Sequence, residues 1–388
     1  MSDEYVRSLA HVEKVIDINP IAGADRVELA TVLGWHCMVQ KNQFHVGDLA
    51  VYIEIDSKCP PTEAFKFLEP KHYAVKTQKY FKGTVISQGL LMHPDDLGLN
   101  ADELTEGQDL TEKIGVTYYE QEDNKRKAPS VDKYKKMAQR NQKLFSKKPI
   151  RWLMRRDWGK KLLFLFFGRK KDRSGGWPEW VVKTDEIRCQ NAPWVFEEKT
   201  PRIVTEKIDG TSATYTLKRG KRGGNDFYVC SRNVVQDNEN HETYYKTNVY
   251  WEIAEKYEIE QVLIFLLNYK FPDAEWITIQ GEIYGKGIQK REYSLDHHEF
   301  AAFNLITSDR GRFGTLEMER ILKQYSIPCV PIVNASFILP DTVDEMLEYA
   351  TDKSKIDGLE REGVVCRKPD GTGSFKAVSN EYLMKYHS

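Results

Sequence analysis

The chain is organised around one stretch, residues 205–212, which reads Thr205-Glu206-Lys207-Ile208-Asp209-Gly210-Thr211-Ser212. Residues 202–208 have strand character and lead into it, and the alternating segment 212–217 leads out. Because side chains two residues apart on a strand point to the same face, Lys207 and Asp209 are predicted to face one pocket. Gly210 lets the chain turn where a side chain would crowd. A lysine held near an acid and a phosphate-bound metal can act as a nucleophile once it loses its proton.

The pattern Lys-x-Asp-Gly is a weak signal alone, because Lys355-Ile356-Asp357-Gly358 repeats it. The second copy lies in a polar stretch at the end of a predicted helix and has no strand before it. It therefore predicts a turn, and the first copy needs support from the rest of the chain.

Composition indicates a globular protein of two domains, since 388 residues are long for a single domain. The net charge of −1 predicts no partner by itself. Six scattered cysteines without a Cys-x-x-Cys pair argue against a zinc site and for reduced thiols in a soluble intracellular protein, in cytoplasm or nucleus. The sequence shows no signal peptide. Its longest apolar run, 162–167, is far short of the roughly 20 residues that span a bilayer, so no membrane partner is expected.

Residues 1–120 are predicted to form an OB-like β-barrel. Short, β-branched strands separated by turn signals are expected at 11–18, 26–33, 35–39, 49–55 and 85–92. OB-folds commonly bind single-stranded nucleic acid through aromatic and cationic side chains. The alternative is a structural barrel that only covers its neighbour.

Residues 121–176 form a basic insert. Between residues 125 and 173 the sequence has 19 Lys and Arg against three Asp, with Trp and Phe interleaved. Such a block is a candidate surface for the phosphate backbone of RNA or DNA, and the alternative is a solvated linker helix. The candidate nucleic-acid-binding residues are Lys135, Lys136, Arg155 and Arg156.

Residues 177–388 are predicted to be α+β, with antiparallel strands around a pocket and helices outside. A dense polar cluster, 183–191, precedes the lysine strand, and the strands 202–208 and 212–217 are expected to pair. Further strands are predicted at 227–230, 276–284, 299–306, 363–367 and 374–378. Helices are predicted at 244–267, 315–325 and 342–350, the last opening with a capping box.

The motifs in this half of the chain, taken in their order along the sequence, resemble those of the covalent nucleotidyltransferases. That group contains DNA ligases, RNA ligases and mRNA-capping guanylyltransferases. The resemblance rests on Lys207-Ile208-Asp209-Gly210, Ser231-Arg232-Asn233, Gly281-Glu282-Ile283-Tyr284-Gly285, Phe300-Ala301-Ala302-Phe303-Asn304, Glu362-Gly363-Val364-Val365 and Ser374-Phe375-Lys376. DNA ligases and capping enzymes carry their OB-fold after the last motif, whereas here a barrel-like domain precedes the first. The order resembles the RNA ligase family with an N-terminal OB domain and a C-terminal adenylyltransferase domain, ATP-grasp-like, with antiparallel sheets and peripheral helices.

The resemblance implies ATP-dependent joining of an RNA 3′-OH to a 5′-phosphate, at nicks in duplexes. The sequence does not determine the oligomeric state, for which a monomer is the favoured expectation. Lys207 would become lysyl-AMP, and Lys376 would stabilise the phosphate charge of each transition state. Asp209, Glu282 and Glu362 would hold Mg²⁺ or Mn²⁺, partly through water. For both glutamates the alternative is an ordinary salt bridge.

The resemblance also implies a nucleotide-binding set, made of Lys183, Arg188, Glu206, Gly210, Arg232, Glu282 and Phe303. Phe303 is expected to stack on adenine, with Phe300 as the alternative that faces the core. Arg232 could instead be a surface hairpin residue.

Two residues depart from the pattern of the family. Ser374 stands where a lysine is frequent, with Lys368 or the OB domain as substitute phosphate contacts, and Asn304 stands where an acid is common. Two further functions stay open, a different covalent nucleotidyltransferase (DNA ligase or guanylyltransferase) and a catalytically degenerate RNA-binding protein.

Overall fold

A computed structural model describes residues 8–119, 177–220, 224–236 and 248–386, together with positions 150, 153, 156 and 163. The basic insert lies almost wholly outside the described residues. Among its candidate contacts, Lys135, Lys136 and Arg155 are outside them, and Arg156 is exposed. The predicted boundaries after residues 120 and 176 stay predictions.

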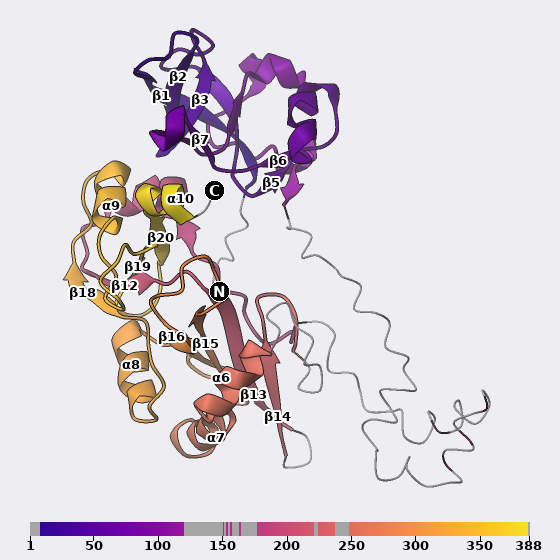
Figure 1. Cartoon of the computed structure of the whole chain (residues 1–388), viewed down its shortest axis with the longest axis vertical. Coiled ribbons are helices and arrows are strands. Elements are labelled where there is room, and N and C mark those ends of the chain that lie inside the picture. Colours follow the sequence, from indigo (N-terminus) through magenta and orange to yellow (C-terminus); the bar gives the residue numbers. More distant parts are fainter. Residues whose placement is uncertain are drawn as a thin grey trace.

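The N-terminal domain is an antiparallel sheet curled into a nearly closed barrel (Figure 1). Its strand order is β3–β2–β1–β4–β9, with bounds β1 Ala10–Pro20, β2 Val27–Val32, β3 Trp35–Gln40, β4 Leu49–Ile53 and β9 Leu90–Met92. The amide of Gln88 donates to the carbonyl of His36 in β3 at 2.8 Å, which brings the two ends of the sheet together. The predicted OB-like barrel is confirmed.

The strand predicted at 85–92 is two strands, β8 (Val85–Ser87) and β9. They are separated at Gly89, whose φ of 105° lies in the left-handed region. Pairing with β8 is β7 (Gln78–Tyr80). A small sheet at the side of the barrel has the strand order β10 (Thr117–Tyr118), β5 (Ser57–Lys58) and β6 (Ala74–Val75), and a helical segment, η1 (Glu63–Lys71), connects β5 to β6.

The C-terminal domain contains two sheets, and the predicted α+β class is confirmed. The first has the order β11–β20–β19–β12–β18, with bounds β11 Ile187–Arg188, β12 Arg202–Lys207, β18 Ile332–Phe337, β19 Gly363–Arg367 and β20 Phe375–Val378. The second has the order β14–β13–β15–β16–β17, with bounds β13 Thr211–Arg219, β14 Asn225–Cys230, β15 Trp276–Gly285, β16 His298–Thr307 and β17 Gly311–Arg312.

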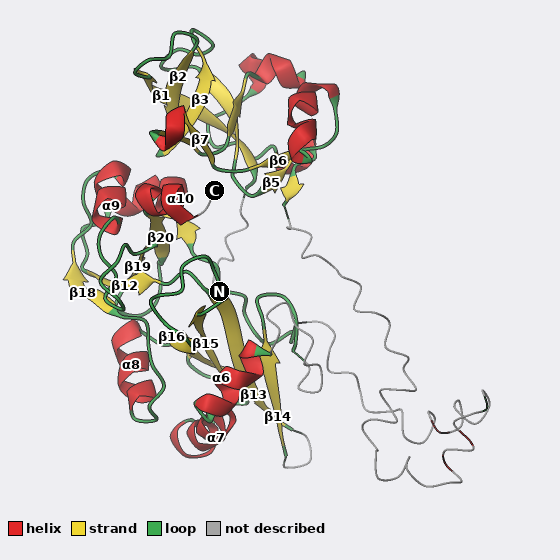
Figure 2. Ribbon diagram, in the orientation of Figure 1, coloured by secondary structure: helices red, strands yellow, loops and turns green. Residues whose placement is uncertain are grey.

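Helices lie outside these sheets (Figure 2). The helices α6 (Val249–Lys256), α7 (Ile259–Phe265) and α8 (Thr315–Lys323) bury apolar side chains in one core with the second sheet. Helix α9 (Val343–Ala350) packs in a separate core with the first sheet, and it opens with the predicted capping box between Thr342 and Glu345. The last helix is α10 (Asn380–Tyr386).

Two local predictions are wrong. The helix predicted over 244–267 is α6 and α7, because Glu258 between them has a φ of 46°, and a left-handed residue ends a right-handed helix. Residues 244–247 of that prediction lie outside the described part. The strands 202–208 and 212–217 do not pair with each other, since β12 and β13 belong to different sheets. Residues 208–210 therefore cross from one sheet to the other.

The barrel contacts the first sheet of the C-terminal domain and α9. The indole N–H of Trp35 donates to Oδ1 of Asn191, and Nδ2 of Asn191 donates to the buried carboxylate of Glu54. Gly34 lies so close to Val343 that a Cβ on it would fall 2.4 Å from Cγ1 of Val343. Figure 1 shows the barrel beside α9, α10 and β20. The two domains are therefore docked through specific buried contacts.

No helix in the described residues is long and apolar enough to cross a membrane. All six cysteines lie in the described part, and none of them forms a disulfide.

Candidate active site

Lys207 is the last residue of β12, and its side chain contacts that of Glu362, one of the three predicted acids. Its register partner in β19 is Gly363, so Glu362, the preceding residue, stands beside it. Nζ of Lys207 lies 2.7 Å from both carboxylate oxygens of Glu362. The two side chains are brought together across 155 residues of sequence by strand pairing.

Three carboxylates influence Lys207. Burial lowers the pKa of its amine, but attraction to Glu362, Glu282 and Asp209 outweighs burial and raises the pKa. Burial raises the pKa of Glu282 to about 8, with Lys207 acting against this and the charges of Glu362 and Asp209 adding to it. Of the three acids predicted from sequence, Glu362 therefore contacts the lysine directly, while Glu282 within β15 and Asp209 after β12 act on it through their charges.

Gly210 permits this arrangement because β13 passes very close to β15. A Cβ at Gly210 would lie 2.3 Å from the carbonyl oxygen of Ile283 and 2.8 Å from Cγ of Glu282. Ser212, two residues later, is the register partner of Glu282. Gly210 thus lets the chain cross between sheets while bringing Glu282 beside Lys207.

Two tyrosines that sequence reasoning missed hold Asp209. The Asp209 amide donates to the hydroxyl of Tyr293 at 2.6 Å, and the hydroxyl of Tyr382 donates to Oδ2 of Asp209 at 2.9 Å. Tyr382 is in the C-terminal helix α10, and Tyr293 follows β15. Neither stands in a recognisable motif, so only the tertiary structure identifies them.

Cationic side chains gather at the neighbouring end of the first sheet. Arg188 in β11 and Lys376 in β20 are register partners in the one parallel pair of that sheet. Burial lowers the pKa of Lys376, and the charges of Arg188 and Lys207 lower it further, against attraction to Asp185. Adjacent cations of this kind favour a polyanion such as a phosphate chain.

Asp185 balances part of this charge and was not predicted as a site residue. Oδ1 accepts from Nζ of Lys376 at 2.6 Å, and Oδ2 accepts from Nη2 of Arg232 at 3.0 Å. Lys183 lies beside the same loop, with Nζ donating to Oδ1 of Asn233 at 3.1 Å. The signal available in the sequence was the polar cluster 183–191.

The choice between the two phenylalanines agrees with the expectation. Phe300 is fully buried in the core and packs edge-on against Tyr215, 5.5 Å between ring centroids. Phe303 is half-buried and packs in a cluster with Ile208, which lies next to Lys207. Phe303 is thus a partly exposed aromatic side chain near the lysine, and its stacking on adenine stays a prediction.

Glu206 points away from Lys207, because neighbouring residues on a strand face opposite sides. Its buried carboxylate accepts from Oγ of Ser354 and from the amide of Lys355 at 2.8 Å. Asp357 pairs with Nη2 of Arg291 at 2.6 Å, with both side chains buried. The second Lys-x-Asp-Gly copy is the predicted turn, and it supports the first copy through the bond from Lys355 to Glu206. A nucleotide contact by Glu206 stays a prediction.

The departures from the family pattern have structural roles here. The hydroxyl of Ser374 donates to Glu186, which also pairs with Arg367 at 3.0 Å. The amide of Asn304 donates to Gln280 at 2.9 Å and to Thr184 at 3.2 Å, which ties β16 to the segment before β11. Lys368, proposed as a substitute phosphate contact, pairs with Glu198 at 2.6 Å.

The three acids do not form a ready-made cage. Among the described residues, no three His, Cys, Asp or Glu side chains stand close enough to enclose a metal ion directly. The donors are hard carboxylate oxygens, and burial together with repulsion from Glu362 and Asp209 raises the pKa of Glu282. Such a set fits a hard cation that keeps several of its waters, as Mg²⁺ does.

Comparisons with known proteins agree with this geometry. A family model described as RNA ligase matches residues 200–387, and a model described as an OB-fold domain matches residues 9–93. No curated protein sequence matches the chain.

Solved structures of Naegleria gruberi RNA ligase match almost the whole chain. An apo mutant is 27% identical with a TM-score of 0.71, covering 98% of this chain and 99% of that chain. A mutant with ATP and Mn is 26% identical with a TM-score of 0.69, covering 98% and 100%. The protein with PPi is 27% identical with a TM-score of 0.69, covering 98% and 99%. With both domain types, their order and the site in agreement, the chain carries an OB-fold domain over residues 9–93 followed by an RNA ligase domain over residues 200–387.

Proposed function

We propose that this RNA ligase uses ATP to seal RNA 3′-OH and 5′-phosphate ends, preferentially at nicks in duplexes, through a covalent adenylate on Lys207. The observation that carries the proposal is the convergence of Asp209, Glu282 and Glu362 on Lys207, beside the cations Arg188 and Lys376.

The first step is nucleophilic substitution at the α-phosphorus of ATP. Nζ of Lys207 gives up a proton and forms a P–N bond, while the P–O bond to pyrophosphate breaks and pyrophosphate leaves. Lys376 and Arg188 offset the negative charge that builds on the phosphates. The AMP then passes to an RNA 5′-phosphate, and attack by the 3′-OH forms the phosphodiester and releases AMP.

In the structure Lys207 is held as an ammonium group by Glu362, which is the resting form rather than the attacking form. A divalent cation bound by these carboxylates, Mg²⁺ or Mn²⁺, would supply positive charge that lowers the pKa of the amine and neutralises the α-phosphate.

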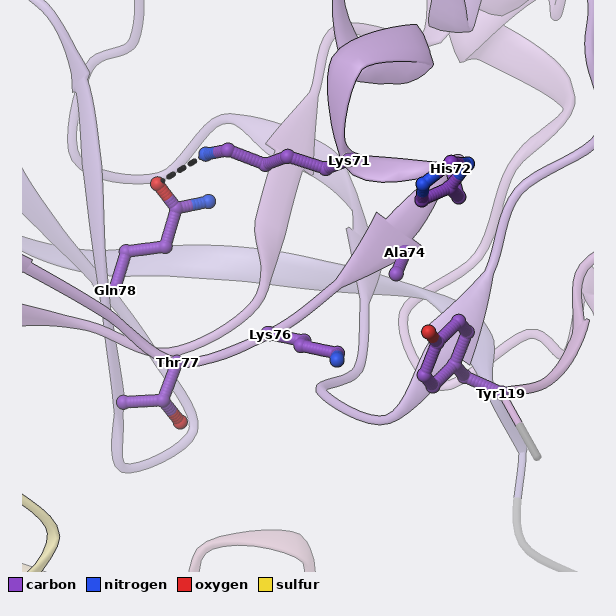
Figure 3. A pocket seen from close by; sticks show the side chains of 7 residues that line it. All are labelled: Lys71, His72, Ala74, Lys76, Thr77, Gln78 and Tyr119. Carbon is purple, nitrogen blue, oxygen red and sulfur yellow. Dashed lines mark hydrogen bonds between the residues drawn. The ribbon is translucent and has the colours of Figure 1, made fainter. Parts of the chain in front are cut away.

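The OB domain offers a surface for the RNA strand. A cavity of about 370 Å³ is lined by Lys71, His72, Ala74, Lys76, Thr77, Gln78 and Tyr119 (Figure 3). Nζ of Lys76 lies 4.4 Å from the ring centroid of Tyr119, and Lys71 bonds Gln78 at 2.7 Å. Among the described residues, no acidic side chain lines the cavity. Cations beside an aromatic ring suit the phosphates and bases of a single strand.

Adenylylation is tested with α-labelled ATP and Mg²⁺, followed by a denaturing gel. Label is expected on the wild type and on Lys355→Ala, and it should be absent from Lys207→Ala. Lys355→Ala is a matched control, because it removes the lysine of the second copy of the motif. Labelling from GTP instead would favour a guanylyltransferase. No label, and no release of pre-bound AMP by pyrophosphate, would favour the RNA-binding alternative.

Substrate choice is tested with nicked duplexes that differ only in the 3′-OH strand. Sealing of an RNA 3′-OH strand and failure on a DNA 3′-OH strand are expected, whereas equal sealing of both would favour a DNA ligase. The double substitution Lys71→Ala and Lys76→Ala should weaken RNA affinity and reduce its salt slope by roughly two. Lys66→Ala with Lys113→Ala is the charge-matched control, since both lysines are exposed outside the cavity.

A further inference from the structure

Arg188 is held in an unusual way for a cation at an active site. Its guanidinium lies over the indole ring of Trp35, with Cζ 5.6 Å from the ring centroid. Within the described residues, its Nη1 is covered by protein atoms and has no hydrogen-bond partner. Its side chain forms no ion pair there either, although Asp185 and Glu186 are close in sequence. Its position therefore depends on stacking against Trp35.

Trp35 belongs to the other domain. It is fully buried at the start of β3 in the barrel, while Arg188 is in β11 of the catalytic domain. The stack is therefore an interdomain contact at the edge of the candidate phosphate site. Arg188 is also the register partner of Lys376, so a displaced guanidinium would alter the charge beside that lysine.

A buried polar chain fixes the orientation of the indole. Nε1 of Trp35 donates to Asn191, and Asn191 donates to Glu54, which is fully buried in the barrel. His11 supports Glu54 with Nε2 at 3.5 Å, and its Nδ1 lies 2.6 Å from Glu13. Asn191 lies three residues after Arg188, so one short segment receives both contacts from the barrel.

We propose that Trp35 is a positioning residue, which holds the Arg188 guanidinium at the phosphate end of the nucleotide site only when the barrel is docked. The barrel thereby completes the site for the adenylylation step, in addition to any contact it makes with RNA. This inference rests on the proposed function, in which Arg188 binds the phosphates of ATP.

The test is a double-substitution cycle on the full chain. The single-turnover rate constant for covalent adenylate formation is measured for the wild type, Trp35→Leu, Arg188→Ala and the double variant. Trp35→Leu is expected to slow the step on the order of tenfold, because a desolvated cation–π contact is lost and the guanidinium shifts. In the Arg188→Ala background the same substitution should change the rate less than twofold. Trp35→Phe keeps an aromatic face and should retain most of the rate.

Loss of folding does not mimic this result. A purely structural role for Trp35 would lower the unfolding temperature and slow the step equally in both backgrounds, so multiplicative effects would overturn the inference. An unchanged rate in Trp35→Leu would overturn it too. If Trp35→Leu is unfolded by circular dichroism, Asn191→Ala takes its place in the same cycle, with the same expectation. Failure of the wild type to form any adenylate would instead overturn the proposed function.

Discussion

At Gly210, the addition of a single methyl group should lower the rate of adenylation far more than it lowers the stability of the fold. In Gly210→Ala the new Cβ would stand 2.3 Å from the carbonyl oxygen of Ile283, against a practical limit of 3.0 Å for real Cβ atoms. The backbone at Gly210, just before β13, and that of β15 must therefore separate by at least about 0.7 Å. The obstacle is backbone, so rotation of a side chain cannot relieve it.

The separation should cost about 1–3 kcal/mol of stability, the usual penalty for overpacking. The separation should have a larger effect on the rate of adenylate formation, because β15 also carries Glu282. A displacement of about 1 Å at an active site lowers the rate roughly 100-fold. The assay is the rate of covalent adenylate formation, followed by intact mass, with thermal unfolding measured in parallel.

Gly224→Ala is the matched control, since a Cβ there meets nothing within 4 Å. It should leave both the rate and the unfolding temperature within error of the wild type. If Gly210→Ala formed adenylate within twofold of the wild-type rate, the close approach of β13 to β15 would not control the geometry at Lys207.

Three further predictions follow from buried charges. Burial lowers the pKa of His11, but its bonds to Glu13 and Glu54 outweigh burial and raise it from 6.5 to about 9. Because the pKa of His11 is higher in the folded than in the unfolded state, its stabilisation of the fold is complete below pH 6.5 and is lost as pH rises to about 9. The free energy of unfolding, measured with urea, should fall by about 3 kcal/mol over this range, and His11→Gln should abolish this pH dependence. Asp357→Ala leaves the buried Arg291 without its ion-pair partner and should destabilise the fold by about 3–5 kcal/mol, whereas Lys355→Ala should change stability by under about 0.5 kcal/mol in the same assay. Glu282→Gln removes one of the three carboxylates around Lys207. It should raise the free energy of unfolding of the metal-free protein by about 1 kcal/mol and abolish adenylation of Lys207. A variant with unchanged stability and full activity would contradict the assignment of Glu282 as a metal ligand.

Local patterns in the sequence determined the chemistry and most of the elements. Runs of apolar and β-branched residues predicted β12, β15 and β16 closely, because strands that are buried along most of their length favour such residues. The order of the motifs around Lys207 pointed to the family, because a lysine nucleophile needs acids and cations of fixed type. The capping box at Thr342 was also readable, since its bonds join residues three apart.

Periodicity did not reveal where these elements join. It gave no sign that Glu258 takes a left-handed conformation, because the apolar spacing continues across it into α7. It also did not show that β12 and β13 enter different sheets. Which strands pair depends on burial over the whole domain, and the residue pattern of one strand does not specify which strand lies next to it.

The tertiary structure alone decided what surrounds the reacting groups. Asp209 is held by Tyr293 and Tyr382, 84 and 173 residues away, and Trp35 reaches Asn191 across 156 residues. Contacts over such separations form only when two domains and two sheets have packed, and no local spacing encodes them. The sequence by itself thus determined which residues can do the chemistry, and packing decided which of them are held in place to do it.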